Sequence, residues 1–230
     1  MNDVIDELHR RGLLALSTDE AALRAHLAEG PVTYYCGFDP TAPSLHVGNL
    51  LQFMVLRALQ RAGHQPVVLV GGATGLIGDP RPSAERQLND HETVATWVQR
   101  IREQVAPFLE LPAETDGLKG PVYVDNLEWT APISAIDFLR EIGKHFRVGK
   151  MLAKEAVAAR LNSEAGISYT EFSYQILQAN DFRELYQRHG VTLQTGGSDQ
   201  WGNLTAGIDL VRRTEGVGVH ALATPLVTKS

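Results

Sequence analysis

Residues 35–49, YCGFDPTAPSLHVGN, have the types and spacing that most clearly point to chemistry. A β-branched and aromatic run leads into this segment and a helical pattern follows it, so we expect a strand, a turn and a helix. Ser44 is the expected N-cap of that helix. His46 and Asn49 then share one face of its first turn, where free backbone N–H groups attract an anion. Gly48 would let a ribose or a ring pack on the backbone; a capped helix with a polar first turn is the alternative.

A second segment, GGATGLIGD at 71–79, holds four glycines within eight residues. It fits neither the dinucleotide fingerprint GxGxxG nor the phosphate loop GxxxxGK(S/T). We interpret it as a place where the backbone closely approaches a ligand, with a tight strand-to-helix turn as the alternative. Asp79 at its end could bind an ammonium group or cap the next turn.

A third segment, TEFSYQILQANDF at 170–182, has a helical pattern with a polar stripe. Tyr174, Gln178 and Asp181 stand at i, i+4 and i+7 and therefore share one face. The charged side chains of this helix lie mostly elsewhere around it. We interpret the stripe as one wall of a polar pocket; a solvated face is the alternative.

A fourth segment, QTGGSDQWGN at 194–203, predicts the end of a strand, two glycines and a helix start. Ser198 or Asp199 is the expected N-cap. Capping alone would explain Asp199 but not the residues in front of it. We therefore expect Asp199 and Gln200 to hydrogen-bond a hydroxyl group of a ligand.

Composition excludes several classes of protein. The chain has 230 residues, a formal charge of −6, eight histidines and one cysteine. That charge argues against a broadly basic nucleic-acid binder, although a local basic patch is compatible with it. No HExxH, paired histidine spacing or cysteine cluster indicates a metal site, and no GxSxG indicates a serine nucleophile. No run approaches the ~18 apolar residues of a membrane span, and residues 1–11 lack a signal core, so we expect a soluble cytoplasmic protein.

Strand and helix patterns alternate along the chain. We expect strands at 32–36, 67–70, 121–124, 191–194 and 219–227. We expect helices at 50–61, 91–111, 133–142, 150–161, 170–179 and 199–213. This alternation predicts one α/β domain, a parallel sheet covered by helices on both faces, with a helical insertion in the middle. Ligands bind beyond the carboxyl ends of such strands, where the glycine-rich segments lie.

The chain closely resembles the catalytic domain of bacterial tyrosyl-tRNA synthetases, which are class I aminoacyl-tRNA synthetases. The segments that carry the resemblance are YCGFDPT at 35–41, GGATGLIGDP at 71–80, FSY at 172–174 and GGSDQWGN at 196–203. It extends over residues 32–230 and implies a Rossmann-like sheet. It also implies that tyrosine attacks the α-phosphate of ATP and that the 3′ end of tRNA(Tyr) then takes the tyrosyl group. ATP with Mg²⁺ would be a substrate, with no tightly bound cofactor, no membrane association and a homodimeric assembly.

The resemblance implies a nucleotide site. The His-Ile-Gly-His signature of the family appears here as HVGN at 46–49, with an amide in place of the second imidazole. His46 would contact phosphate, Asn49 adenosine, and Thr41 would lie near the γ-phosphate; these three are the implied catalytic residues. The residues implied for ATP or the adenylate are Gly37, Asp39, His46, Gly48, Asn49, Gly197 and Asp199.

The resemblance also implies a tyrosine site. Its residues would be Tyr35, Asp79, Tyr174, Gln178, Asp181, Gln194 and Gln200. Tyr35 and Asp181 would hydrogen-bond the substrate phenol, and phenylalanine would leave both without a partner. Asp79, Tyr174 and Gln178 would hold the ammonium group. Gln194 would support the pocket from behind, and Gln200 would lie near the carboxyl end of the substrate.

Some features depart from the family pattern or have two interpretations. The loop at 81–86 lacks the usual lysine and is one residue shorter, so Arg81 and Arg86 would supply its positive charge. The second signature, Lys-Met-Ser-Lys-Ser, would follow within a few residues of Lys229, so we expect the chain to be a catalytic part without that loop or the anticodon-binding regions. A tyrosine- and ATP-binding module with little turnover is the alternative. A tryptophan-specific relative is disfavoured, because indole has no hydroxyl group for Tyr35 and Asp181.

Two surface assignments remain open in the sequence. The homodimer interface would use residues 138–151, where Phe146 and Met151 lack an obvious core period; a place in the local core is the alternative. Arg212 and Arg213 could contact the acceptor stem of tRNA, or interact with the dipole at the end of their helix.

Overall fold

The computed structural model describes residues 3–80, 88–109, 119–164 and 166–228. The predicted loop at 81–86, with Arg81 and Arg86, lies outside these ranges, and so does Lys229. In the part of the chain that is described, no helix combines the length and the apolar character that crossing a bilayer requires.

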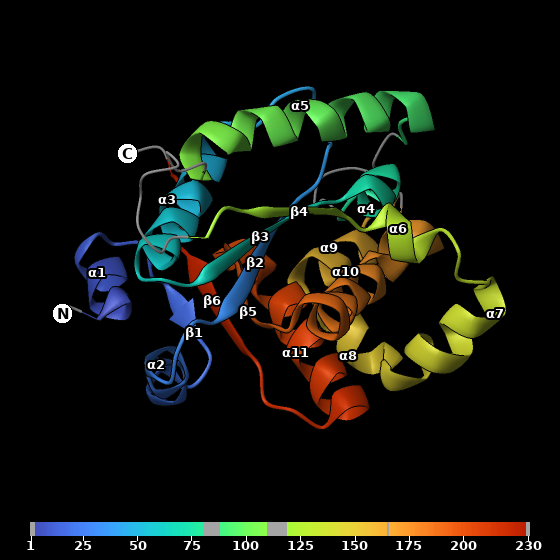
Figure 1. Cartoon of the computed structure of the whole chain (residues 1–230). Helices are drawn as coiled ribbons and strands as arrows, with labels where there is room; N and C mark the ends of the chain where they lie inside the picture. The colour runs from blue at the N-terminus through green and yellow to red at the C-terminus, as the bar shows by residue number, and fades with distance from the viewer. Residues whose placement is uncertain (1–2, 81–87, 110–118, 165, 229–230) are drawn as a thin grey trace.

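One six-stranded sheet runs through the chain in the order β1–β6–β5–β2–β3–β4 (Figure 1). The strands are β1 (Leu16–Ser17), β2 (Thr33–Phe38), β3 (Gln65–Val70), β4 (Val122–Asp125), β5 (Val191–Gly197) and β6 (His220–Thr224). Strands β6, β5, β2, β3 and β4 are parallel neighbours, whereas β1 lies antiparallel to β6 at the edge. The predicted mainly parallel sheet is confirmed. The sheet is nevertheless mixed, because β1 pairs antiparallel with β6. With two residues, β1 is too short to show an alternating pattern in the sequence.

Helices cover both faces of the sheet, because alternate side chains of each strand point to opposite sides. On β2, Tyr34, Cys36 and Phe38 pack into one core cluster with residues of α3 (Val47–Arg61) and α5 (His91–Leu109). Tyr35 packs into the other, with residues of α10 (Tyr169–His189) and α11 (Trp201–Glu215). Figure 1 shows α3 and α5 on one side of the sheet and α10 and α11 on the other.

Two N-terminal helices, α1 (Val4–Arg10) and α2 (Glu20–Ala28), lie outside the sequence prediction. Both begin at an aspartate whose side chain accepts a hydrogen bond from a backbone N–H group, Asp3 from Ile5 and Asp19 from Ala22. Such caps stabilise the first turn. Their buried leucines and isoleucine join the core on the α3 side of the sheet. The helices are short, so their apolar period spans too few turns to be recognised.

The predicted helical insertion lies between β4 and β5, and it is more broken than the sequence indicates. Its elements are α6 (Leu127–Thr130), α7 (Ala135–Asp137), a π-helical turn η1 (Phe138–Ile142), a 3₁₀ turn η2 (Gly143–His145), α8 (Val148–Leu152) and α9 (Glu155–Leu161). The helix predicted at 133–142 is therefore a series of short turns, and the helix predicted at 150–161 is interrupted after Leu152. Ile142 and Met151 nevertheless pack against α10 and α11 in a separate cluster.

The turn from β3 into α4 (Gly72–Ile77) explains the glycines at 71–78. A Cβ atom on Gly71 would overlap the side chains of Asp39 and Thr74, and one on Gly72 would overlap the carboxylate of Asp125. The latter carboxylate accepts a hydrogen bond from the Gly72 N–H group at 3.1 Å. None of these glycines lines the cavity described below. They leave room for the protein's own side chains, which favours the tight-turn alternative for these glycines over a close approach of the backbone to a ligand.

We predict that Gly72→Ala destabilises the protein by ~1–3 kcal/mol, the usual cost of inserting a methyl group into a packed site. The new Cβ must displace the Asp125 carboxylate at the end of β4. Urea unfolding measures the change. Gly218→Ala is the matched control, because nothing lies within 4 Å of a Cβ at that position. Equal midpoints for the two variants would contradict the steric argument.

Candidate active site

A cavity of about 460 Å³ opens beyond the carboxyl ends of β2 and β5. Every residue that the resemblance implies for the nucleotide and tyrosine sites lines it, although the segments that carry them are far apart in the chain. These residues are Tyr35, Gly37, Asp39, Thr41, His46, Gly48, Asn49, Asp79, Tyr174, Gln178, Asp181, Gln194, Gly197, Asp199 and Gln200. The parallel register of β2 with β5 brings Tyr35 beside Gln194 and Cys36 beside Thr195.

Cys36 is buried, and burial raises the pKa of its thiol to about 12.

Helix α3 begins at the cavity with His46 as its N-cap, so the prediction of Ser44 as the cap is wrong. The Nδ1 atom of His46 accepts from the Gly48 N–H group at 3.1 Å, and the His46 N–H group donates to Asn49 Oδ1 at 3.0 Å. A Cβ atom on Gly48 would lie 2.9 Å from the imidazole Cε1 atom of His46, so glycine leaves the room that this orientation of the ring requires. Because Nδ1 is an acceptor, the neutral ring carries its proton on Nε2 and can donate it to an anion.

The deep end of the cavity holds Tyr35 and Asp181, which are 1% and 2% exposed. Asp181 accepts from Asn126 Nδ2 at 2.9 Å and from Trp129 Nε1 at 2.8 Å. Burial raises the pKa of its carboxyl group to about 8, although these two hydrogen bonds oppose the shift. Burial also raises the pKa of Tyr35 well above its usual value, so its hydroxyl group keeps its proton. Tyr35 packs against Phe182, with ring centroids 5.4 Å apart.

A chain of buried hydrogen bonds extends from Asp181 to Asp39. Asn126 Nδ2 donates to Asp181 and also to Thr74 Oγ1 at 3.0 Å. The Thr74 hydroxyl group donates to Asp39 Oδ1 at 2.6 Å, and the Tyr174 hydroxyl group donates to Asp39 Oδ2 at 2.6 Å. Within the protein, Asp39 therefore fixes a side chain of the predicted tyrosine site, besides lining the cavity where we expected a nucleotide.

Asn126, Trp129 and Thr74 are site residues that the sequence reasoning missed. Asn126 comes directly after β4, and Thr74 follows β3. The signal was their position, since residues beyond the carboxyl ends of parallel strands face the ligand side of the sheet. The residue types of Asn126 and Thr74, by contrast, suggest only a turn.

A second group of polar side chains surrounds Asp79. Gln200 Nε2 donates to Asp79 Oδ2 at 2.9 Å, and Asn203 Nδ2 donates to Asp79 Oδ1 at 3.4 Å and to Gln200 Oε1 at 2.8 Å. Neither Ser198 nor Asp199 caps a helix with its side chain, because a 3₁₀ turn, η3 (Ser198–Gln200), precedes α11. The predicted caps are therefore wrong.

A hydrogen bond joins helix α3 to the end of β6 on another wall of the cavity. Gln52 Nε2 donates to Thr224 Oγ1 at 2.6 Å, and both residues line the cavity. Gln52 is 7% exposed and Thr224 is 1% exposed. The sequence reasoning also missed this bond, because the partners are distant in the chain.

Several buried polar atoms on the cavity wall have no hydrogen-bond partner in the described ranges. They are the hydroxyl oxygen of Tyr35 and the Oε1 atoms of Gln178 and Gln194. Leaving such a group unpaired costs about 1–3 kcal/mol, so a native fold rarely gathers them without a reason. Their position in one cavity indicates a polar ligand with several hydrogen-bonding groups. In the same ranges, no group of three or more His, Cys, Asp or Glu side chains is arranged to hold a metal ion.

Comparison with known proteins gives consistent results. Residues 27–230 match the family model described as class I tRNA synthetases (W and Y). The tyrosine–tRNA ligase of Streptomyces griseus subsp. griseus is 67% identical over 231 residues, which cover 100% of this chain and 54% of that protein. The chain thus spans about half the length of the curated relatives it matches.

Solved structures also match over the whole chain. A C-terminally truncated mitochondrial tyrosyl-tRNA synthetase from Coccidioides posadasii has a TM-score of 0.85 and 30% identity, and 68% of that chain is covered. The corresponding truncated enzyme from Aspergillus nidulans has a TM-score of 0.89 and 28% identity, with 71% covered.

We predict that, because the pKa of Asp181 is raised, the unfolding free energy of the ligand-free protein falls as the pH rises from about 4 to about 8. Its carboxyl group keeps a proton in the folded state that the unfolded chain has already lost, so unfolding releases that proton. Relative to Asp181→Asn, the unfolding free energy of the wild type falls by up to about 1.4 kcal/mol per pH unit within that window. Urea unfolding at pH 5, 6, 7 and 8 measures it. A difference between the two proteins that does not change with pH would contradict the shift.

Proposed function

The chain belongs to the class I tRNA synthetase family that contains the tryptophan and tyrosine enzymes, and we propose that it is the catalytic domain of a tyrosine–tRNA ligase. In this proposal the tyrosine carboxylate attacks the α-phosphate of ATP, pyrophosphate leaves, and tyrosyl-adenylate forms. The tyrosyl group then passes to the 3′ end of tRNA(Tyr). The observation that carries the proposal is the buried Tyr35 hydroxyl group, which has no hydrogen-bond partner among the described residues and lies at the deep end of the cavity that Asp181 also lines.

The deep end of the cavity suits a phenol. A phenol O–H group can donate to Asp181 and accept from Tyr35, so both buried groups gain a partner. Phenylalanine would leave the Tyr35 hydroxyl group unpaired and give Asp181 no bond beyond those from Asn126 and Trp129, and an indole ring has no hydroxyl group to join the two residues. This difference, and not the shape of the ring, is the basis on which the site would select tyrosine.

The middle of the cavity suits the amino-acid head group. Asp79 supplies the negative charge for the ammonium group, and the unpartnered Gln178 Oε1 atom supplies a further acceptor. The Tyr174 hydroxyl group is held by Asp39 at the same wall. Gln200 lies at the carboxyl end of the substrate, and Gln194 supports the pocket from behind.

The outer part of the cavity suits ATP. The proton on His46 Nε2 and the start of α3 would meet phosphate oxygens, with Thr41 near the γ-phosphate and Asn49 near adenosine. The residues proposed around the nucleotide and adenylate are Gly37, Asp39, His46, Gly48, Asn49, Gly197 and Asp199. The tyrosine carboxylate is already ionised at neutral pH, so the reaction needs no general base. Rate enhancement would come from positioning and from stabilising charge on the leaving pyrophosphate, with Mg²⁺ accompanying ATP as substrate.

We predict that Tyr35→Phe reduces the preference of the protein for tyrosine over phenylalanine roughly tenfold, the value of about one hydrogen bond. Titration calorimetry with each amino acid measures the ratio of their dissociation constants. The matched control is Tyr34→Phe, because the Tyr34 hydroxyl group donates to the Leu56 carbonyl at 2.5 Å on the other face of β2.

Tyr34→Phe should lower stability and leave the preference unchanged. A wild-type chain that does not bind tyrosine, or binds phenylalanine equally well, would contradict the proposed function. A preference that Tyr34→Phe changes as much as Tyr35→Phe would contradict the role of Tyr35.

Association with tRNA(Tyr), a homodimeric assembly and a cytoplasmic location belong to the same proposal. Within the predicted interface segment, Phe146 and Met151 pack with the local cluster around Ile142, which favours the local-core alternative for these two side chains. Exposed apolar side chains in and beside residues 138–151 are Ile136, Leu139, Val148 and Leu152. A second copy of the chain would cover these side chains.

We predict that the double variant Leu139→Glu, Val148→Glu shifts the protein from dimer to monomer, because each charge would be buried at the interface. Sedimentation equilibrium measures the mass. Val47→Glu is the control, because Val47 is 68% exposed and lies outside this segment. A wild-type monomer, or a dimer that the double variant leaves intact, would contradict this interface.

A further inference from the structure

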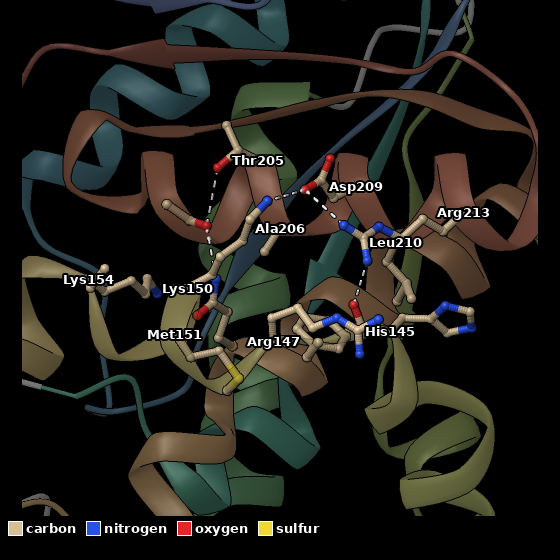
Figure 2. Close-up of a pocket in the computed structure, with 14 residues that line it drawn as sticks. His145, Arg147, Lys150, Met151, Lys154, Thr205, Ala206, Asp209, Leu210 and Arg213 are labelled. Carbon is tan, nitrogen blue, oxygen red and sulfur yellow. Dashed lines mark hydrogen bonds and ion pairs between the residues drawn. The ribbon is translucent and has the colours of Figure 1, made fainter.

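A second cavity, of about 360 Å³, lies between α8 and α11. Figure 2 shows residues 145–154 facing α11 across it. Lys150 and Arg213 both lie 3.9 Å from the carboxylate of Asp209, and Arg213 also donates to the His145 carbonyl at 2.9 Å. These cations therefore have partners within the cavity wall. Lys154 also lines this cavity but makes its hydrogen bond elsewhere, toward the candidate active site.

Lys154 is held between the two cavities. Its Nζ atom donates to Asn203 Oδ1. Its stem packs on α11, where a Cβ added to Gly202 would lie 3.0 Å from Lys154 Cε. Burial lowers the pKa of the ammonium group, and the charge of Asp79 opposes that shift. Removing an ammonium group from water is costly unless it has a function or a strong partner, and here its hydrogen-bond partner is a neutral amide.

The bond from Lys154 fixes which way the Asn203 amide points. With Oδ1 on the ammonium group, the Nδ2 side faces Gln200 Oε1 at 2.8 Å and Asp79 Oδ1 at 3.4 Å. Gln200, whose Oε1 is thereby occupied, turns its own Nε2 to Asp79 Oδ2 at 2.9 Å. Both carboxylate oxygens of Asp79 thus accept from amides. With the Asn203 amide reversed, an oxygen would face Asp79 and repel it.

We propose that Lys154 is a positioning residue for the ammonium subsite, acting through Asn203 on Asp79 and Gln200. The inference rests on the proposed function, since it takes the substrate to be an α-amino acid. Lys154 does not touch the substrate in this scheme. Its effect is to orient one amide, and that amide holds the carboxylate that pairs with the substrate ammonium group. A direct electrostatic effect would have the opposite sign, because a lysine charge repels an ammonium group.

The test is Lys154→Met, which keeps the apolar stem and removes the charge and the hydrogen bonds. Titration calorimetry compares L-tyrosine with 3-(4-hydroxyphenyl)propanoate, which has the phenol and the carboxylate but no ammonium group. We expect the dissociation constant of L-tyrosine to rise about tenfold and that of the des-amino ligand to change less than twofold. A merely structural role would weaken both ligands equally.

Controls keep the result interpretable. Lys150→Met removes the same charge from the same cavity, but its side chain is 74% exposed and its ion-pair partner is Asp209, so both dissociation constants should stay unchanged. Asn203→Leu, which keeps the size of the side chain, should give the same ligand-selective loss as Lys154→Met. The double variant should lose no more than either single variant, because both act on one path. If Lys154→Met does not fold, as judged by its melting transition, Lys154→Leu provides the decisive comparison, because it is shorter and likewise has no donor for Asn203 Oδ1.

The outcomes separate the two proposals. Failure of the wild type to bind L-tyrosine would overturn the proposed function. Wild-type binding with an equal loss for both ligands in the variants, no loss, or tighter L-tyrosine binding in Lys154→Met would overturn only the inference about Lys154.

Discussion

The buried hydrogen-bond chain from Asp39 through Thr74 and Asn126 to Asp181 is the constraint on which the rest of the site depends. It joins residues that follow or lie on β2, β3, β4 and α10, so it can form only when the sheet order and the packing of α10 are both correct. Within a low-dielectric interior such a chain is strong when complete and costly when broken. The glycines at the start of α4 serve the same chain, because any Cβ on Gly71 would overlap Asp39 and Thr74.

The alternation of side chains along β2 divides the tasks of the fold. Tyr34 faces α3 and closes a hydrogen bond to the Leu56 carbonyl within the core, whereas the neighbouring Tyr35 faces α10 and keeps its hydroxyl group unpaired at the cavity. Adjacent, chemically identical side chains thus contribute stability on one face and, in the proposed function, recognition of the substrate on the other. A shift of one residue in the register of β2 would exchange these roles.

The cavity combines carboxyl groups that already have hydrogen-bond partners with neutral polar atoms that have none among the described residues. Asp39, Asp79 and Asp181 all accept hydrogen bonds from the protein, so their orientation is fixed before a ligand arrives. The atoms of Tyr35, Gln178 and Gln194 that have no partner among the described residues belong to neutral groups. Leaving a neutral group without a hydrogen bond costs less free energy than leaving a charge without a partner. This division fits a site that is organised in advance for a small zwitterion with a phenol at one end.

The sequence by itself determined the α/β class and the mainly parallel sheet, because strand periodicity and glycine punctuation are local signals. Its family motifs are local signals too, and the site residues that they imply all line the cavity. It did not determine the caps, the broken helices between β4 and β5, or the two N-terminal helices, whose patterns are short. The sequence did not identify as site residues Asn126, Thr74, Gln52 and Lys154, and here the reason is not the length of a pattern. Their types are ordinary and the partners in these bonds stand 49 to 172 residues away, so only tertiary packing decided which polar groups meet.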